Sequence, residues 1–254
     1  AERYLAGQSL NAFQAAFAVR QNGSLKNSEA KTSSHPKTKR KENMTQEQLQ
    51  KAWQALFDGQ YQLAKQFVYQ IDQDSYSTLN LKAYIALEEK DFQLARQFLK
   101  DYYAQAMSQK NLEEQHIGLH QLAMVEREEE HFQKAYDLIM AEAAIITEHF
   151  PDDVLKASVN LYEQGYLQFK LGNIHLAEEL LQETLNLALQ TDDFVNHACA
   201  YRGLAEVMLA KGDIKMAKFD AQKALACFEK AGDTVGAAGL KDIMAQINSQ
   251  GRSL

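Results

Sequence analysis

From residue 44 to the C-terminus, apolar and polar residues follow a helical pattern with few interruptions. Alanine, leucine, glutamine, glutamate and lysine dominate this stretch, and all five favour helices. Alternating runs rich in valine, isoleucine and threonine, bounded by Asn-Gly or Asp-Gly turns, do not occur. The two prolines, Pro36 and Pro151, fall at expected boundaries. The pattern therefore predicts an all-α protein.

One short pattern occurs five times along this stretch. In each copy a polar turn ends on an aromatic residue or isoleucine, and an alanine follows three residues later. The copies are DGQYQLAKQFV (58–68), EKDFQLARQFL (89–99), EEHFQKAYDLI (129–139), LGNIHLAEELL (171–181) and KGDIKMAKFDA (211–221). Twelve residues before each alanine lies a second small residue: Ala52, Ala83, Ala123, Gly165 or Ala205. Small residues on both sides of a tight turn predict two helices that cross closely.

The alanines of successive copies recur along the chain as Ala64, Ala95, Ala135, Ala177 and Ala217. After a shorter first step their spacing is nearly constant, and a period of this size is typical of a helical solenoid. Over residues 45–230 the pattern resembles the tetratricopeptide repeat (TPR). The resemblance implies a right-handed solenoid of about five TPR-like helix pairs. The spacing of the later copies exceeds that of the commonest TPR and is similar to that of the peptide-sensing regulators of Gram-positive bacteria and of kinesin light chains.

The same register gives the expected helices. First helices are predicted over 45–58, 76–89, 111–129, 152–171 and 192–211, and second helices over 61–73, 92–107, 132–148, 174–190 and 214–230. The pairs Asp152-Asp153, Asp192-Asp193 and Asp233-Thr234 offer capping side chains where three helices should begin. The last of these helices (234–247) has no partner sequence after it, so we expect it to be a C-terminal capping helix.

A candidate binding surface follows from the first helices, which line the concave groove in the TPR family. Side chains on the helical stripe around each small packing residue mix aromatic residues with isolated polar and charged ones. That mixture is typical of protein-binding surfaces, whereas a buried stripe should be uniformly apolar. We predict that a peptide or partner protein binds there, through Trp53, Asn80, Tyr84, His120, Met124, Arg127, Tyr162, Tyr166, Arg202 and Glu206. The alternative is that the aromatic residues of this stripe pack on neighbouring helices.

Individual side chains in this stripe suggest specific contacts. The Asn80 amide can both donate to and accept from the backbone of an extended peptide. Arg127 or Arg202 would suit a peptide carboxylate through a bidentate contact. The Lys/Asn set with which some TPR proteins bind two carboxylates is not evident in the sequence.

Other chemistry finds little support in the sequence. Nucleophile-elbow, zinc-protease, phosphate-loop and dinucleotide motifs do not occur, so we predict no enzyme activity and no cofactor. His116 and His120 are four residues apart with Glu113 nearby, but a third convincing ligand does not accompany them, so no metal site is predicted. Cys199 and Cys227 are expected to be reduced thiols in a cytoplasmic protein.

Charge separates the N-terminus from the rest. Residues 1–43 contain eight Lys/Arg and three Glu, net +5, and the remaining 19 basic and 31 acidic residues give −12. We predict a basic, mostly flexible arm (1–43) and a TPR-like repeat domain (44–250). The arm is expected to contact nucleic acid weakly. Residues 7–31 faintly resemble part of a helix-turn-helix domain, so a remnant of such a domain remains an alternative to a mobile tail.

Three functions remain open at this stage. The first is a non-enzymatic scaffold for a protein or peptide, and the second is a peptide-responsive transcriptional regulator of the helix-turn-helix plus TPR type. The third, a response-regulator phosphatase, would need an N-terminal helical bundle for which this chain lacks room. No apolar run approaches the roughly 18 residues of a membrane span, so no membrane is expected. The oligomeric state is left open, with a homodimer as one possibility.

Overall fold

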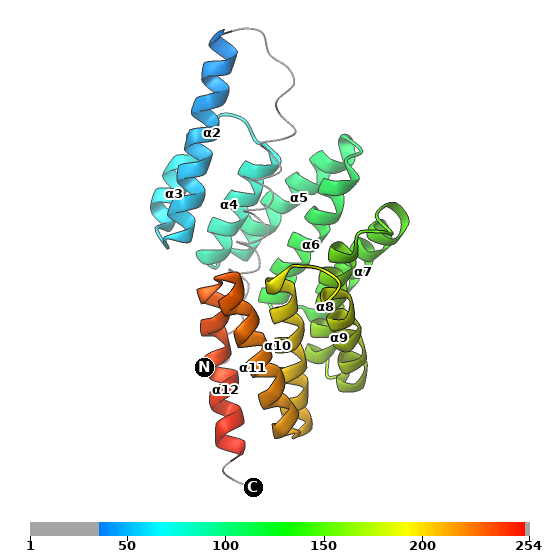
Figure 1. The fold of residues 1–254 in the computed structure, drawn as a ribbon. Helices are drawn as coiled ribbons and strands as arrows, with labels where there is room; N and C mark the ends of the chain where they lie inside the picture. Colours follow the sequence, from blue (N-terminus) through cyan, green and yellow to red (C-terminus); the bar gives the residue numbers. More distant parts are fainter. Residues whose placement is uncertain (1–35, 252–254) are drawn as a thin grey trace. The chain divides into compact units, whose positions relative to one another are not determined.

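A computed structural model describes residues 36–251 of the chain. These residues form eleven helices and no strand (Figure 1). The helices are α2 (Pro36–Phe57), α3 (Tyr61–Val68), α4 (Tyr76–Glu88), α5 (Phe92–Ser108), α6 (Leu112–Glu128), α7 (Phe132–His149), α8 (Val154–Lys170), α9 (Ile174–Ala188), α10 (Phe194–Lys211), α11 (Ile214–Ala231) and α12 (Thr234–Gln250). The predicted all-α class is confirmed. Within the described range, residues 36–125 and 126–251 are two compact units.

The predicted helices agree with the observed ones to within three residues, except at two ends. Helix α2 begins at Pro36 rather than near residue 45, because proline suits a first helical turn and the residues that follow are good helix formers. Helix α3 ends at Val68 rather than near residue 73. A polar loop follows it, and Ser75 then caps α4 in a capping box with Thr78.

The N-terminal predictions fall largely outside the described residues. The predicted boundary at 43/44 lies inside α2, and the basic run KTKRK (37–41) is helical. The expectations for the arm before residue 36, including the helix-turn-helix resemblance over 7–31, lie outside the described part of the chain. Among residues 36–251, none of the helices combines the length and the apolar composition that a bilayer crossing requires.

The small residues of the repeat lie where the helices of a pair cross. All five repeat alanines are fully buried, and so are their partners twelve residues earlier: Ala52, Ala83, Ala123, Gly165 and Ala205. The aromatic or isoleucine side chain that ends each turn is half-buried at the joint, in Tyr61, Phe92, Phe132, Ile174 and Ile214. The repeat is therefore a packing pattern, as predicted.

The helix starts also follow the prediction. Asp153, Asp193 and Asp233 are N-caps, and each side chain accepts a hydrogen bond from a backbone N–H in the first turn of its helix. The turns that follow Lys211 and Ala231 place a glycine in the left-handed conformation, with φ of 79° at Gly212 and 71° at Gly232. These local signals separate long, otherwise uninterrupted helices.

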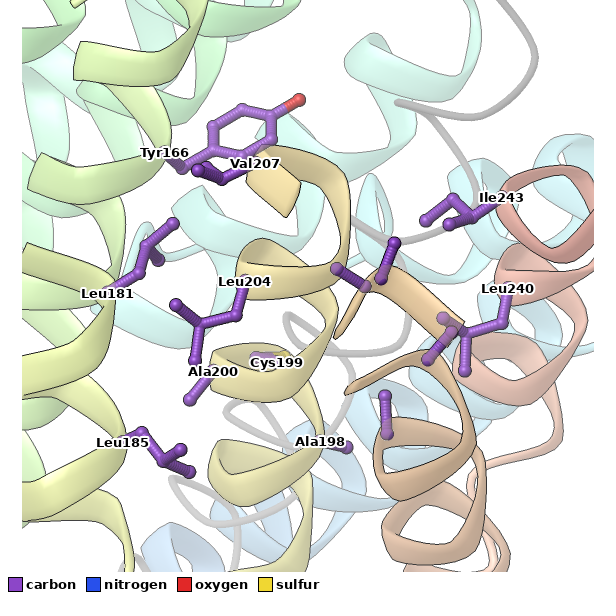
Figure 2. Close-up of a cluster of buried hydrophobic side chains, with 14 of the residues drawn as sticks. Tyr166, Leu181, Leu185, Ala198, Cys199, Ala200, Leu204, Val207, Leu240 and Ile243 are labelled. Atoms are coloured by element: carbon purple, nitrogen blue, oxygen red, sulfur yellow. The ribbon is translucent and has the colours of Figure 1, made fainter. Parts of the chain in front are cut away.

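The unit 126–251 contains an apolar core cluster formed by α8 to α12, part of which Figure 2 shows. It runs from Tyr166 and Leu181 through Leu204 to Leu240 and Ile243, so residues of α8, α9, α10 and α12 share it. Helix α12 packs on α11 with its buried face and exposes a largely polar face. It therefore covers the end of the repeats, which is the predicted role of a capping helix.

The unit 36–125 is built in the same way from shorter helices. Helix α3 packs on both α2 and α4, and α4 packs on α5. A small apolar cluster joins Leu79, Tyr102 and Ile117, with Tyr102 fully buried. The first helices of this unit carry Trp53, Asn80 and Tyr84, so packing on α3 and α5 fixes the position of the predicted binding stripe.

One buried carboxyl group makes stability depend on pH. Asp220 of α11 is only 5% exposed, and burial, with a smaller contribution from Asp213, raises its pKa from 3.8 to about 6. The folded protein therefore holds this proton more tightly than the unfolded chain does. The unfolding free energy should fall as pH rises from about 4 to above 6, by at most about 3 kcal/mol. Asp220→Asn should raise the melting temperature at pH 8 but hardly at pH 4, as measured by circular dichroism.

The exposed Asp242 of α12 provides the control. Asp242→Asn should keep the pH dependence of the wild type. An equal melting temperature of Asp220→Asn and wild type at pH 8 would contradict a buried, ionised Asp220.

Candidate functional site

The predicted stripe in the unit 36–125 is an aromatic and amide cluster. The side chains of Trp53, Asn80 and Tyr84 are buried on α2 and α4. The rings of Trp53 and Tyr84 meet edge to face, with their centroids 5.6 Å apart. The Tyr84 hydroxyl donates to Oε1 of Gln121 on α6, at 3.1 Å. This hydrogen bond orients the Tyr84 ring from a third helix.

Asn80 differs from the two aromatic members of this cluster because it buries a polar amide, and it is 1% exposed. Burial raises the pKa of the neighbouring Tyr84 hydroxyl, and hydrogen bonding with Gln121 and, more weakly, with Asn80 opposes that rise. Nevertheless, neither Nδ2 nor Oδ1 of Asn80 has a hydrogen-bond partner of good geometry among the described residues. A buried amide without partners costs about 1–3 kcal/mol.

The other predicted residues of this unit, His120 and Met124, are also buried on α6. Met124 is among the largest fully buried side chains of the described residues. His116, one turn before His120, lies 3.5 Å from Glu113 through its Nε2. The two histidines are therefore part of the packed face of α6.

In the unit 126–251 the predicted residues form a charged and aromatic network. Nη1 of Arg127 on α6 lies 2.6 Å from Oε2 of Glu163 on α8. The same guanidinium lies over the Tyr166 ring, 5.1 Å from its centroid. The Tyr166 ring stacks on that of Tyr162, with a centroid distance of 6.2 Å and an interplanar angle of 25°. One cation thus pairs with a carboxylate and covers an aromatic ring.

The network continues onto α10. Nη2 of Arg202 donates to the Tyr162 hydroxyl at 2.9 Å, and Nε of Arg202 lies 3.4 Å from Oε1 of Glu206. Lys170 adds a second cation beside the Tyr166 ring, 5.4 Å from the centroid, and its side chain is exposed. The five predicted residues of this unit are thus brought together, because α6, α8 and α10, which carry them, are the first helices of successive repeats.

Burial controls the titration of this network. It raises the pKa of the Tyr162 hydroxyl far above its ordinary value, so the hydroxyl stays protonated. Burial alone would lower the pKa of Arg127, but the Glu163 carboxylate and the nearby tyrosines more than offset it. The network therefore contains charged arginines and neutral tyrosines at any pH near neutrality.

Sequence reasoning missed two residues that hold these clusters together. Glu163 is 2% exposed and pairs with Arg127, and Gln121 is 2% exposed and accepts from Tyr84. Both lie next to a predicted stripe residue in the sequence, Glu163 beside Tyr162 and Gln121 beside His120. The sequence signal that could have identified both residues is a polar residue inside an otherwise apolar helical face.

One group of side chains has the composition of a metal site. The ligand atoms of Glu126, Glu129 and His131, at the turn between α6 and α7, all lie within 4.8 Å of one another. Nδ1 of His131 lies 2.9 Å from Glu126, and Nζ of Lys134 lies 4.0 Å from the same carboxylate. A lysine so close already supplies positive charge to this carboxylate, so the contacts are those of an ion-pair network at a turn.

The two cysteines are free thiols. Cys199 is buried in the core of the unit 126–251, and burial raises its pKa to about 12. A thiol that keeps its proton at neutral pH is a poor nucleophile, so Cys199 acts as an apolar core residue.

The fold is shared with solved structures of repeat proteins, although no family model matches the sequence and no curated protein matches it. BtubC from P. vanneervenii is similar with a TM-score of 0.54 and 16% identity, over 85% of this chain and 92% of that chain. Aspartyl phosphate phosphatase F from Bacillus subtilis is similar with a TM-score of 0.57 and 12% identity, over 85% of this chain and 61% of that chain.

A third similar structure contains tetratricopeptide repeats itself. A Signal Transduction ATPase with Numerous Domains from Pyrococcus horikoshii, which has a tetratricopeptide repeat sensor, is similar with a TM-score of 0.65 and 17% identity. The match covers 82% of this chain and 33% of that chain. At these identities the likeness concerns the fold. The repeat pattern, the buried small residues and these neighbours together identify the chain as a protein with the TPR fold.

Proposed function

We propose that this protein is a non-enzymatic scaffold that binds a peptide or a partner protein along its first helices. The observation that carries the proposal is the Asn80 amide, which is buried beside Tyr84 and lacks partners of good geometry among the described residues. An extended peptide presents one N–H donor and one C=O acceptor per residue, and an asparagine amide can pair with both at once.

The surroundings of Asn80 suit such a ligand. Tyr84 offers apolar ring surface next to the amide, the Trp53 ring meets that of Tyr84 edge to face, and Gln121 holds the Tyr84 ring in place. Rigid aromatic side chains lose little conformational entropy on binding, so they are effective anchors for a ligand. Because Asn80 is buried in the absence of a ligand, we expect neighbouring side chains other than Tyr84, which Gln121 holds, to move when a peptide binds.

The network of the unit 126–251 adds selectivity in this proposal. Each of its two arginines already has a carboxylate beside it, Glu163 for Arg127 and Glu206 for Arg202. A ligand carboxylate would have to compete with these groups, so a strongly acidic ligand has little advantage there. Lys170 is exposed and can meet a ligand without breaking an ion pair of the network. We therefore expect aromatic and neutral ligand groups to dominate this part of the interaction.

The test uses a phage-displayed library of random peptides, selected against the full chain. A selected peptide should bind Asn80→Leu roughly thirtyfold more weakly than wild type, because its backbone loses both hydrogen bonds to the amide. The melting temperature of the variant should be unchanged or higher, since an amide without partners is replaced by an apolar group of similar size. Isothermal titration calorimetry measures the peptide affinity, and circular dichroism measures the melting temperature.

The matched control is Asn248→Leu, which changes an exposed asparagine on α12. It should leave peptide affinity at the wild-type value. Asn80→Ala provides a second variant in case leucine does not fit. A library that yields no binder, or one whose peptides bind both Asn80 variants as tightly as wild type, would overturn the proposal.

A further inference from the structure

The exposed faces of α9 and α11 carry opposite charges at equivalent positions. Both are second helices of their repeats, and their packing alanines, Ala177 and Ala217, align one helix with the other. In this alignment, Glu178 corresponds to Lys218, and Glu183 corresponds to Lys223. The same structural surface is therefore acidic on one helix and basic on the next.

Both faces also expose large apolar side chains. Leu176 of α9 and Met216 of α11 occupy equivalent positions, and each is 41% exposed. Phe219 of α11 is 48% exposed, and Nζ of Lys223 lies over its ring, 5.4 Å from the centroid. Exposed apolar side chains surrounded by charges of one sign are typical of a surface that meets a partner.

Most charges at these faces have no ion-pair partner among residues 36–251. Glu179 and Glu183 of α9 and Lys218 and Lys223 of α11 are exposed, and the described residues contain no ion pair to any of them. The carboxylate of Glu178, by contrast, lies 2.6 Å from Nζ of Lys211. Helix α10 packs against both α9 and α11, so these two second helices flank the same first helix (Figure 1).

We propose that a second copy of this chain binds here, with α11 of each copy lying against α9 of the other. A two-fold axis makes the arrangement self-complementary, because each copy gives one basic and one acidic face. Residues 126–251 are acidic overall, whereas α11 has more basic than acidic residues, with Lys215, Lys218, Lys223 and Lys230 against Asp220 and Glu229. An anionic membrane or a nucleic acid would also meet the acidic side chains of α9, which packs on the same first helix as α11 does. The acidic α9 face of a second copy avoids this repulsion and brings Leu176 against Met216 and Phe219.

The two-fold geometry allows a decisive charge-swap experiment on the full chain, with sedimentation velocity as the readout. The wild type should form a dimer at micromolar concentration that weakens as salt is raised. Reversing α11 (Lys218→Glu with Lys223→Glu) or α9 (Glu179→Lys with Glu183→Lys) should weaken self-association by at least about tenfold, since both contacts then oppose like charges.

Mixing the two reversed variants should restore a dimer. One contact then pairs the two reversed faces, and the other pairs the two native faces, so both are complementary again. A chain with all four substitutions should also form a dimer by itself. The control is Lys241→Glu on the exposed face of α12, which should associate like the wild type. Circular dichroism checks that each variant is folded.

Two results would overturn the proposal. A wild type that stays monomeric over the whole concentration range would show that the faces do not associate. A wild-type dimer that survives both reversals would place the interface elsewhere. The test does not involve Asn80 or a peptide, so its outcome is independent of the proposed function.

Discussion

Replacing Arg127 by alanine is expected to destabilise the protein by about 3–5 kcal/mol, because the substitution leaves a buried carboxylate without its partner. Glu163 is 2% exposed, and the guanidinium of Arg127 is its ion-pair partner at 2.6 Å. The Tyr166 ring would also lose the cation that lies 5.1 Å from its centroid. Urea-induced unfolding followed by circular dichroism measures the change.

A paired substitution separates the cost of leaving Glu163 unpaired from the net contribution of the ion pair to stability. Arg127→Met with Glu163→Leu removes both charges and keeps apolar volume, so it should cost much less than Arg127→Ala alone. Lys241→Ala, at an exposed position of α12, serves as the control and should stay within about 0.5 kcal/mol of wild type. If Arg127→Ala were equally neutral, Glu163 would have to be stabilised by another group, and the network described for α6, α8 and α10 would be wrong.

The second large effect is expected at Leu181 of α9, where Leu181→Ala should destabilise the protein by about 2–5 kcal/mol. Its side chain, labelled in Figure 2, is 1% exposed and fills the space beside two glycines, Gly165 of α8 and Gly203 of α10. A Cβ atom on Gly165 would lie 2.8 Å from Cγ of Leu181, and one on Gly203 would lie 2.8 Å from Cδ2. The leucine and the two glycines therefore form a single packing arrangement.

This arrangement predicts that the effect of Gly165→Ala on stability changes sign when Leu181 is replaced by alanine. Gly165→Ala should destabilise the wild type by about 1–3 kcal/mol, because the added methyl group meets Leu181. In the Leu181→Ala background the same methyl group enters the cavity, so Gly165→Ala should instead restore stability. A double-mutant cycle measured by urea unfolding tests both signs. Additive effects of the two substitutions would mean that the two side chains do not share this space.

The parts of the fold that the sequence predicts are those with local causes. The alanines at helix crossings, the aspartate caps and the turns each depend on a few neighbouring residues, so they can be found without knowing the tertiary structure. The two helix ends that differ show the limit. The start of α2 lies in a run of charged helix formers, and the end of α3 lies before Asp72 and Asp74, which favour a loop.

The candidate site was predicted in its positions but not in its burial. The stripe residues lie on the expected helices, yet Trp53, Tyr84 and Tyr166 are buried against neighbours. Burial depends on how close successive helices come, and helical periodicity within one helix does not report that distance. The partners Glu163 and Gln121 were missed for the same reason, because each contacts a side chain on the first helix of the preceding repeat. Whether the stripe binds a ligand stays a prediction that the Asn80 variants test.

The aspartate caps of α8, α10 and α12 have a consequence for how the chain can change length during evolution. Asp153, Asp193 and Asp233 recur at equal intervals, and each starts a helix that packs on the pair before it. Helix α12 thus stands where the first helix of another pair would stand. A duplication of the segment from Asp193 to Gly232 would place a copy of α10 on α11 and a copy of α11 under α12. The contacts of α10 with α11 and of α11 with α12 would be repeated, so only the contact between α11 and the copied α10 would be new.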